Sequence, residues 1–227
     1  MPITTCVFDA YGTLFDVSAA ARIAAQEDGM EALAESWPAL AEGWRRKQLE
    51  YSWMRAMTGQ HCDFWQVTQD GLDWAMEARG ITGAAVRERL LQLYRELAAY
   101  PEVPAMLTQL KEMGLTTAIL SNGSPGMLSD AVTSAGVGDL LDAILSVESV
   151  GIFKPAAKVY DLVEERFGTR ADQVLFVSSN GWDAASAKSY GFTVAWANRR
   201  GDPVDRLPGR PDHVVPDLSR ITELKVF

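Results

Sequence analysis

Histidine and cysteine are scarce in this sequence, which has only two of each among 227 residues. Cys6 and Cys62 cannot form a disulfide framework or a metal-type cysteine pair. Neither His61 nor His213 stands in a local Ser–His–Asp pattern or at zinc-ligand spacing, and we interpret both as structural residues. The chemistry of this chain is therefore expected to rest on other side chains.

Basic residues and long apolar stretches are also in short supply. Lys and Arg number 21 against 30 Asp and Glu, a net charge of −9, which argues against a nucleic-acid partner. A small anionic substrate is still compatible, because a few cations in a cleft can oppose the overall charge. No stretch reaches the roughly 18 apolar residues of a membrane span, and the N-terminus lacks signal-peptide features. We expect a soluble, cytoplasmic protein without membrane association.

Short, nearly continuous apolar runs recur along the chain, as in strands that are covered on both faces. The predicted strands span residues 4–9, 116–120, 143–147, 174–177, 193–197 and 213–215. Helix-length segments at 104–113, 127–135, 156–167 and 183–190 separate the later ones. This alternation predicts an α/β fold with a doubly wound parallel sheet.

One long segment breaks the alternation and is predicted to be entirely helical. Apolar residues recur there at helical spacing: Leu33, Trp37, Leu40 and Trp44, then Leu49, Trp53 and Met57. Ser36 is a candidate N-cap ahead of Pro38, and helix breaks are predicted at Gly71, Gly80 and Gly83. We therefore predict a helical cap, residues 17–96, inserted into a core domain of residues 1–16 and 97–227.

Polar residues follow the predicted strands where they end. Because ligands bind beyond the carboxyl ends of strands in open α/β sheets, these segments should meet at one edge. The segments are Asp9 to Thr13, Ser121 to Ser124, Phe153-Lys154-Pro155, and Ser178 to Asp183. Polar segments after several strands indicate a ligand site more specifically than any one of the segments does.

Asp9 is the candidate nucleophile, presented at a strand end before a glycine-containing turn. A plain turn aspartate is the structural alternative. Lys154 would be an ordinary surface lysine by itself, but opposite Asp9 its charge would keep the carboxylate ionised. The Ser121-Asn122-Gly123 step is a turn signal whose hydroxyl, amide and backbone N–H groups could also hold an anion.

Four segments together resemble the sequence motifs of the haloacid dehalogenase superfamily, in the same order. They are FDAYGTLFD, ILSNGSP, the Lys-Pro step and LFVSSNGWDA. The cap segment GWRRKQLEYSW is similar to its counterpart in the 2-haloacid dehalogenases. The resemblance covers nearly the whole chain and implies a Rossmann-like core with an inserted cap, and a covalent aspartyl intermediate.

Two departures separate this sequence from the phosphatases that make up most of the superfamily. Phosphatases carry a second Asp two residues after the nucleophile, where this chain has Tyr11, and acids for magnesium where it has Ser179. Magnesium requires several oxygen ligands, usually carboxylates and phosphate. Halide leaves without a proton, so carbon–halogen displacement needs neither acid. We therefore expect no metal and no cofactor.

The resemblance to the dehalogenases implies a role for each candidate residue. It assigns the attack on C2 of a small halogenated carboxylic acid to Asp9. It assigns the substrate carboxylate to Ser121, Lys154 and the backbone of Ala10 and Tyr11. It assigns the departing halide to Arg45 and Asn122. It assigns support of Asp9 and of the hydrolytic water to Thr13, Tyr160, Ser178, Asn180 and Asp183, with Asp183 as our first choice of base.

The cap is expected to add a dry wall around the substrate, from Phe64 and Trp53 together with Trp182 of the core; interhelix packing is the structural alternative. Arg46 follows Arg45 directly and should point about 100° away on a helix. Three other functions stay open: a phosphatase or phosphonate hydrolase, a fluoroacetate-preferring dehalogenase, and a non-catalytic binding protein, which the presence of Asp9 and Lys154 disfavours. The resemblance also implies a homodimer.

Overall fold

The computed structural model describes residues 2–30 and 33–227, so residue 1 of the predicted core and residues 31–32 of the predicted cap lie outside the described residues. Its centre is a sheet of six strands in the order β3-β2-β1-β4-β5-β6. Every neighbouring pair is parallel. The strands are β1 (Thr5–Phe8), β2 (Thr116–Ser121), β3 (Ala143–Ser146), β4 (Val174–Ser178), β5 (Thr193–Ala197) and β6 (His213–Val215). This confirms the doubly wound parallel sheet that the alternation predicted and the Rossmann-like core that the resemblance implied.

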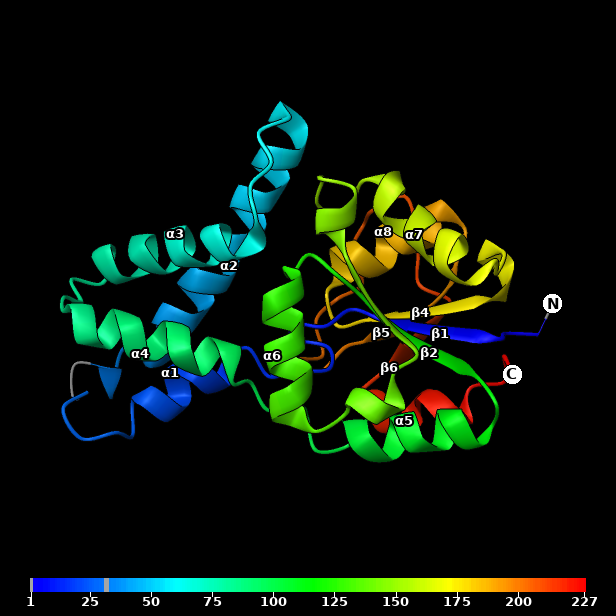
Figure 1. The fold of residues 1–227 in the computed structure, drawn as a ribbon, viewed down its shortest axis with the longest axis horizontal. Coiled ribbons are helices and arrows are strands. Elements are labelled where there is room, and N and C mark those ends of the chain that lie inside the picture. The colour runs from blue at the N-terminus through cyan, green and yellow to red at the C-terminus, as the bar shows by residue number, and fades with distance from the viewer. Residues whose placement is uncertain (1, 31–32) are drawn as a thin grey trace.

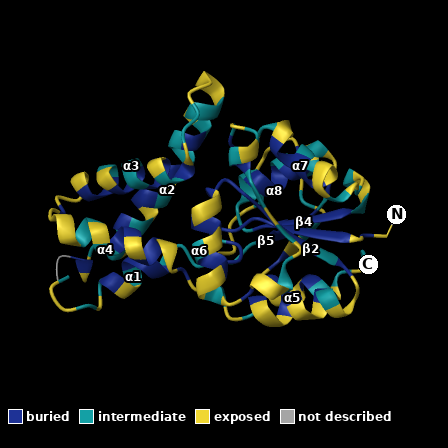
Figure 2. Ribbon diagram, viewed as in Figure 1, coloured by how far each residue is buried: buried dark blue, intermediate teal, exposed yellow. Residues whose placement is uncertain are grey.

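Helices cover both faces of the sheet, which is why most positions of its strands are apolar. Figure 1 shows α7 and α8 on one face and α5 on the other. All four residues of β1 and all five of β4 are buried. Figure 2 shows the central strands in the colour of buried residues. The helices of the core are α5 (Val103–Glu112), α6 (Pro125–Ala135), α7 (Ala157–Phe167) and α8 (Gly181–Tyr190).

The segment between β1 and β2 is helical, as predicted. It contains α1 (Ala19–Ala24), α2 (Trp37–Thr58), α3 (Phe64–Glu77) and α4 (Ala84–Arg95), which form the separate helical layer beside the sheet in Figure 1. Helix α2 begins directly after Ser36, with Pro38 in its first turn. Gly80 and Gly83 lie between helices with positive φ, as expected for breaks.

The break predicted at Gly71 is wrong, because this glycine lies inside α3. A Cβ atom there would stand 3.4 Å from the backbone nitrogen of Gln48 and 3.4 Å from the ring of Trp44. Both residues belong to α2, so Gly71 allows two helices to approach closely. A glycine at a packing contact and a glycine at a helix end look alike in sequence.

The chain enters and leaves the helical cap at one place. Phe15 and Ala99 form an antiparallel bridge. The amide of Asp16 donates to the carbonyl of Ala98 at 3.1 Å, and that of Tyr100 donates to the carbonyl of Leu14 at 2.9 Å. The outgoing and returning segments are thus paired beside the carboxyl end of β1. Within the described residues, no helix is long and apolar enough to cross a membrane.

Candidate active site

Asp9 follows β1 at the point where the sheet reverses its strand order, between β1 and β4. Asp9 is 6% exposed. Lys154 Nζ lies 3.2 Å from Oδ1, whereas Oδ2 accepts hydrogen bonds from Asn180 Nδ2 at 2.8 Å and from Thr13 Oγ1 at 3.0 Å. The two oxygens are therefore not equivalent: Oδ2 has two neutral donors, and Oδ1 has one cationic donor.

The hydroxyl of Thr13 has only one possible orientation. The backbone N–H of Ser179 donates to Thr13 Oγ1 at 2.8 Å, so this oxygen is the acceptor there. Its own proton must then go to Asp9 Oδ2. The indole of Trp196 in β5 donates to the carbonyl of Ser179 at 3.2 Å, which fixes the loop that holds Thr13. Ser178 accepts from the amide of Asn180 at 3.1 Å and shapes the same loop.

Lys154 joins two buried carboxylates. Its side chain is 1% exposed, and Nζ lies 2.8 Å from Asp183 Oδ2 as well as 3.2 Å from Asp9. Burial opposes the charge on Lys154, but the carboxylates of Asp183 and Asp9 outweigh it and hold the pKa of the ammonium above its ordinary value. The lysine is therefore a permanent cation between two acids. Its peptide bond to Pro155 is cis.

Asp183 lies in the first turn of α8 and is fully buried. Tyr160 of α7 donates to its Oδ1 at 2.8 Å, so Tyr160 supports Asp183 and not Asp9 directly. Burial raises the pKa of Asp183, and the charge of Lys154 opposes that rise only in part. A carboxylate with a raised pKa accepts protons more readily than an ordinary surface acid.

Donors for an anion surround Asp9. The amides of Ala10 and Tyr11 form no hydrogen bond with another described residue. Ser121 Oγ accepts from the amide of Gly123 at 3.1 Å, which leaves its own proton for another acceptor. Asn122 Oδ1 accepts from the amide of Lys154 at 2.9 Å, so its NH₂ group is turned the other way.

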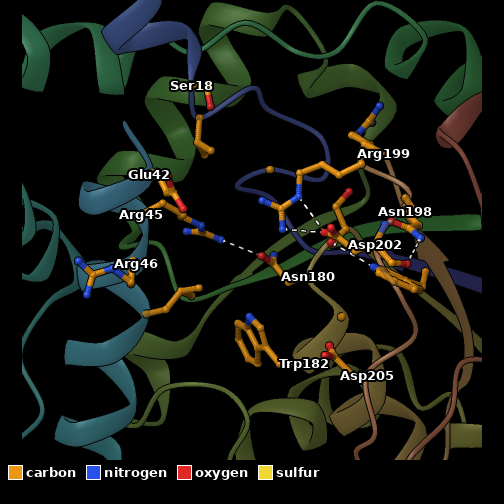
Figure 3. A pocket seen from close by; sticks show the side chains of 18 of the residues that line it. Ser18, Glu42, Arg45, Arg46, Asn180, Trp182, Asn198, Arg199, Asp202 and Asp205 are labelled. Carbon is orange, nitrogen blue, oxygen red and sulfur yellow. Dashed lines mark hydrogen bonds and ion pairs between the residues drawn. The ribbon is translucent and has the colours of Figure 1, made fainter. Parts of the chain in front are cut away.

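Arg45 brings a cation from the cap to this edge. Its guanidinium donates to the carbonyl of Tyr11 and to Asn180 Oδ1, at 3.2 Å each. Figure 3 shows Arg45 reaching from α2 toward Asn180, while Arg46 points away from it. Arg46 instead pairs with Glu50 and lies over the ring of Trp74. Asn180 thus connects Arg45 to Asp9.

Aromatic rings enclose the site on the cap side. The ring of Tyr11 stacks on Tyr94 with centroids 5.6 Å apart, and Phe64 lies 6.3 Å from Tyr11 and 5.9 Å from Phe153. Burial raises the pKa of Tyr11 well above its ordinary value. Trp53 and Trp182 meet edge to face at 5.4 Å. Arg45, Trp53, Asn180 and Trp182 border a cleft of about 1200 Å³ between α2 and the core, which leads to solvent.

Reasoning from sequence missed several residues of this edge. Tyr94, Phe153 and Glu148 are among them; Glu148 accepts from the amide of Phe64 at 3.3 Å and contacts His61 Nε2 at 2.9 Å. Phe153 was placed in the predicted loop with Lys154, but its side chain was given no role in the site. Arg199 is another: it follows β5, and the rule that located the other loops applies equally to that strand end. Tyr94 and Glu148 carried no comparable signal.

The positions that hold magnesium ligands in related phosphatases have other partners here. Tyr11 is packed among aromatic rings, and Ser179 is bound through its backbone to Thr13 and Trp196. Within residues 2–30 and 33–227, no group of three or more His, Cys, Asp or Glu side chains is arranged to hold a metal ion.

Comparisons with known proteins agree with this geometry. The family model of the haloacid dehalogenase-like hydrolases matches residues 3–191. (S)-2-haloacid dehalogenase 1 of Pseudomonas sp. (strain CBS-3) is 41% identical over 224 residues, 98% of this chain and 96% of that protein.

Two solved structures are similarly close. A dehalogenase with an intermediate complex has a TM-score of 0.94 and 37% identity, over 100% of this chain and 98% of that one. The L-2-haloacid dehalogenase of Xanthobacter autotrophicus with chloropropionic acid covalently bound has a TM-score of 0.84 and 36% identity, over 98% of both chains. The chain therefore belongs to the haloacid dehalogenase-like hydrolases and, among them, to the (S)-2-haloacid dehalogenase family.

Proposed function

We propose that this enzyme hydrolyses (S)-2-haloacids to (R)-2-hydroxy acids and halide, through an ester formed on Asp9. The observation that carries the proposal is the unequal bonding of the two Asp9 oxygens beside a buried, permanently charged Lys154. The covalently bound chloropropionic acid in the similar Xanthobacter enzyme supports an ester of this kind.

In the first step, an Asp9 oxygen attacks C2 and the carbon–halogen bond breaks with its electron pair going to the halide. Oδ1 is the better candidate, because it has a single donor and keeps a free lone pair. The substrate carboxylate is held by Ser121, Lys154 and the amides of Ala10 and Tyr11, whose N–H groups have no other partner among the described residues. Attack from the side opposite the halogen inverts C2.

The departing halide is received by Arg45 and by the NH₂ group of Asn122. Arg45 contacts Asn180 and Asn122 contacts the amide of Lys154, which are two of the residues bonded to Asp9, and negative charge develops on the halogen only as the bond breaks. Donors aimed at such charge stabilise the transition state more than the bound substrate. Phe64, Trp53 and Trp182 keep the surroundings poor in water, which strengthens these interactions.

In the second step, water attacks the carbonyl carbon of the ester. The negative charge of that intermediate falls on Oδ2, where Thr13 and Asn180 already donate. Asp183, whose pKa burial raises, accepts the proton of the water, and Tyr160 keeps it oriented. Ser178 holds Asn180 in place. The bond between Cγ of Asp9 and Oδ1 then breaks, and the hydroxy acid leaves with that oxygen, which takes up the proton held by Asp183.

An isotope experiment tests the covalent step. A single turnover in H₂¹⁸O, with enzyme in excess, should give unlabelled hydroxy acid and leave ¹⁸O in Asp9. Chiral analysis should show (R)-lactate from (S)-2-chloropropionate. Labelled product in the first turnover, or retention at C2, would mean that water attacks the substrate directly or that the scheme is otherwise wrong.

We propose further that the reaction needs no metal, because Tyr11 and Ser179 stand where phosphatases carry acids. Halide release should be equal with and without EDTA, and hydrolysis of p-nitrophenyl phosphate with magnesium should be negligible. Magnesium-dependent phosphatase activity of similar rate would favour the phosphatase alternative. Release of fluoride from fluoroacetate in preference to the other halides would favour the defluorinating alternative.

The remaining expectations are also proposals. We place the domain boundary at the paired crossings, with residues 17–96 as cap and 1–16 and 97–227 as core, supported by the Phe15–Ala99 bridge. We propose a cytoplasmic homodimer that binds no nucleic acid, supported by the free thiols, the family and the charge of −9. Light scattering, cell fractionation and limited proteolysis at the crossings test these points.

A further inference from the structure

Arg199 makes three contacts around the base of the Asp9 loop. It follows β5, and its side chain is 18% exposed. Its Nη2 donates to the carbonyl of Thr13 at 3.0 Å, and its Nη1 lies 2.7 Å from a carboxylate oxygen of Glu102. The guanidinium carbon lies 3.7 Å from the ring centre of Tyr100. A lysine could not replace these contacts, because only the planar guanidinium can lie over the ring and donate to two oxygens at once.

The contact with Thr13 bears directly on the nucleophile. The carbonyl of Thr13 is held by Arg199, and its hydroxyl gives its only proton to Asp9 Oδ2. A shift of this backbone would turn the hydroxyl away from the oxygen on which charge develops during ester hydrolysis. Errors of about 1 Å in such positions reduce rates by up to roughly 10²-fold.

The other two contacts show what holds Arg199 itself. Tyr100 and Glu102 stand on the segment that returns from the cap, and Thr13 stands on the segment that leaves the core for the cap. Arg199 therefore ties both crossings together at one point. Glu102 is fixed in turn at the start of α5, where it accepts from the amide of Leu218 at 3.4 Å.

We propose that Arg199 is a positioning residue for the dehalogenation reaction, which holds Thr13 in the place where its hydroxyl can stabilise Asp9. The inference rests on the proposed function. Arg199 does not contact the groups that we assign to the substrate carboxylate, so its effect falls on turnover and not on substrate binding. Glu102 neutralises its charge, so the effect is positional and not a long-range field.

The test uses Arg199→Met, which keeps the length of the side chain and removes its donors. Arg199→Lys is the conservative variant, and Arg200→Met is the matched control, because the side chain of Arg200 is 83% exposed and forms an ion pair with Asp202 of the same loop. We expect Arg199→Met to lower kcat about tenfold with KM changed less than about twofold. Arg199→Lys should recover part of kcat, and Arg200→Met should match the wild type.

A double-mutant cycle separates positioning from general stability. In a Thr13→Val background there is no hydroxyl to position, so adding Arg199→Met should lower kcat less than about twofold further. The inference would be overturned if the two substitutions lowered kcat by independent factors that multiply in the double variant. It would also be overturned if Arg199→Met raised KM and left kcat unchanged. If Arg199→Met does not fold, the same cycle is run with Arg199→Lys. A wild-type protein that releases no halide would contradict the proposed function itself, and this inference with it.

Discussion

The two sides of the active site are built differently. On the core side, Asp9, Lys154 and Asp183 are almost wholly buried, and Lys154 joins the two carboxylates at 3.2 Å from Asp9 and 2.8 Å from Asp183. On the cap side, Arg45 enters from α2 and makes two 3.2 Å contacts at the border of an open cleft. In the mechanism that we propose, the core holds the nucleophile and its hydrogen-bond donors in place. The cap supplies a cation that acts when the leaving group acquires charge.

The largest effect should come from the core nucleophile. Asp9→Asn keeps the shape of the side chain but removes its charge, so halide release should fall by on the order of 10⁴-fold or more. Asp202→Asn is the control, because Asp202 lines the cleft but pairs with the exposed Arg200, and it should leave activity intact. Halide release measured by ion chromatography, with circular dichroism to check folding, tests this. Substantial activity in Asp9→Asn would mean that another group attacks the substrate.

Lys154→Met should damage both activity and stability. It leaves the fully buried Asp183 without its cation, and breaking a buried pair costs about 3–5 kcal/mol in the free energy of unfolding. Urea denaturation measures this loss. Adding Asp183→Asn should recover part of the stability, since the unpaired charge is gone, but no halide release. If the double variant were no more stable than Lys154→Met, the ion pair would not be the source of the loss.

Arg45→Ala should have a smaller effect, confined to the chemical step. Partial charge on the halogen at about 4 Å is worth roughly 2–3 kcal/mol, or about 30–150-fold in kcat. Chloride is the poorer leaving group, so kcat should fall more for 2-chloropropionate than for 2-bromopropionate. Kinetics with both substrates measure the difference.

Arg46→Ala is the control, because Arg46 points away and pairs with Glu50. It should change neither substrate's kcat. An equal rise in KM for both halides in Arg45→Ala would make Arg45 an anchor for the carboxylate. A larger loss in Arg46→Ala would show that the helix face has been misassigned.

The smallest expected effect is on the pH profile. Because the pKa of Lys154 is held above its ordinary value of 10.5, the lysine stays charged through neutral and mildly alkaline pH. The stability that its charge contributes is fully present below pH 10.5 and is lost as the pH rises through the folded-state pKa. Halide release should accordingly show no alkaline limb below about pH 10. A limb near pH 8–9 that disappears in Lys154→Arg would show that burial dominates instead.

The core was more predictable from sequence than the cap, for a physical reason. Strand ends in a parallel sheet meet at one edge, so Asp9, Lys154 and Asp183 could be grouped before their distances were known. Helical spacing indicates only that a helix has an apolar face, not which helix it meets. The contacts of Gly71 with α2, and of Tyr94 with Tyr11, follow from that packing and left no signal.

Contacts between distant segments set a similar limit. Glu148 and His61 are 87 positions apart, and Arg199 and Thr13 are 186 apart. A lone Glu or Arg in a loop looks like a solvated surface residue, because its partner is chosen by the tertiary fold. The sequence also does not show which side chain binds which carboxylate. It grouped Tyr160 with Asp9, whereas the hydroxyl of Tyr160 binds Asp183.

The bridge between Phe15 and Ala99 has a consequence for how this protein can be recombined. The two ends of the helical insertion are paired with each other at the Phe15–Ala99 bridge. The folding of the sheet should therefore depend only weakly on the length of the segment between them. Because closure entropy grows only slowly with loop length, a longer segment between these positions would add little to the cost of folding the core. An exchange of the insertion would keep Asp9 but remove Arg45, Phe64 and Tyr94, so the replacement would have to cover Tyr11 and supply a new cation beside Asn180.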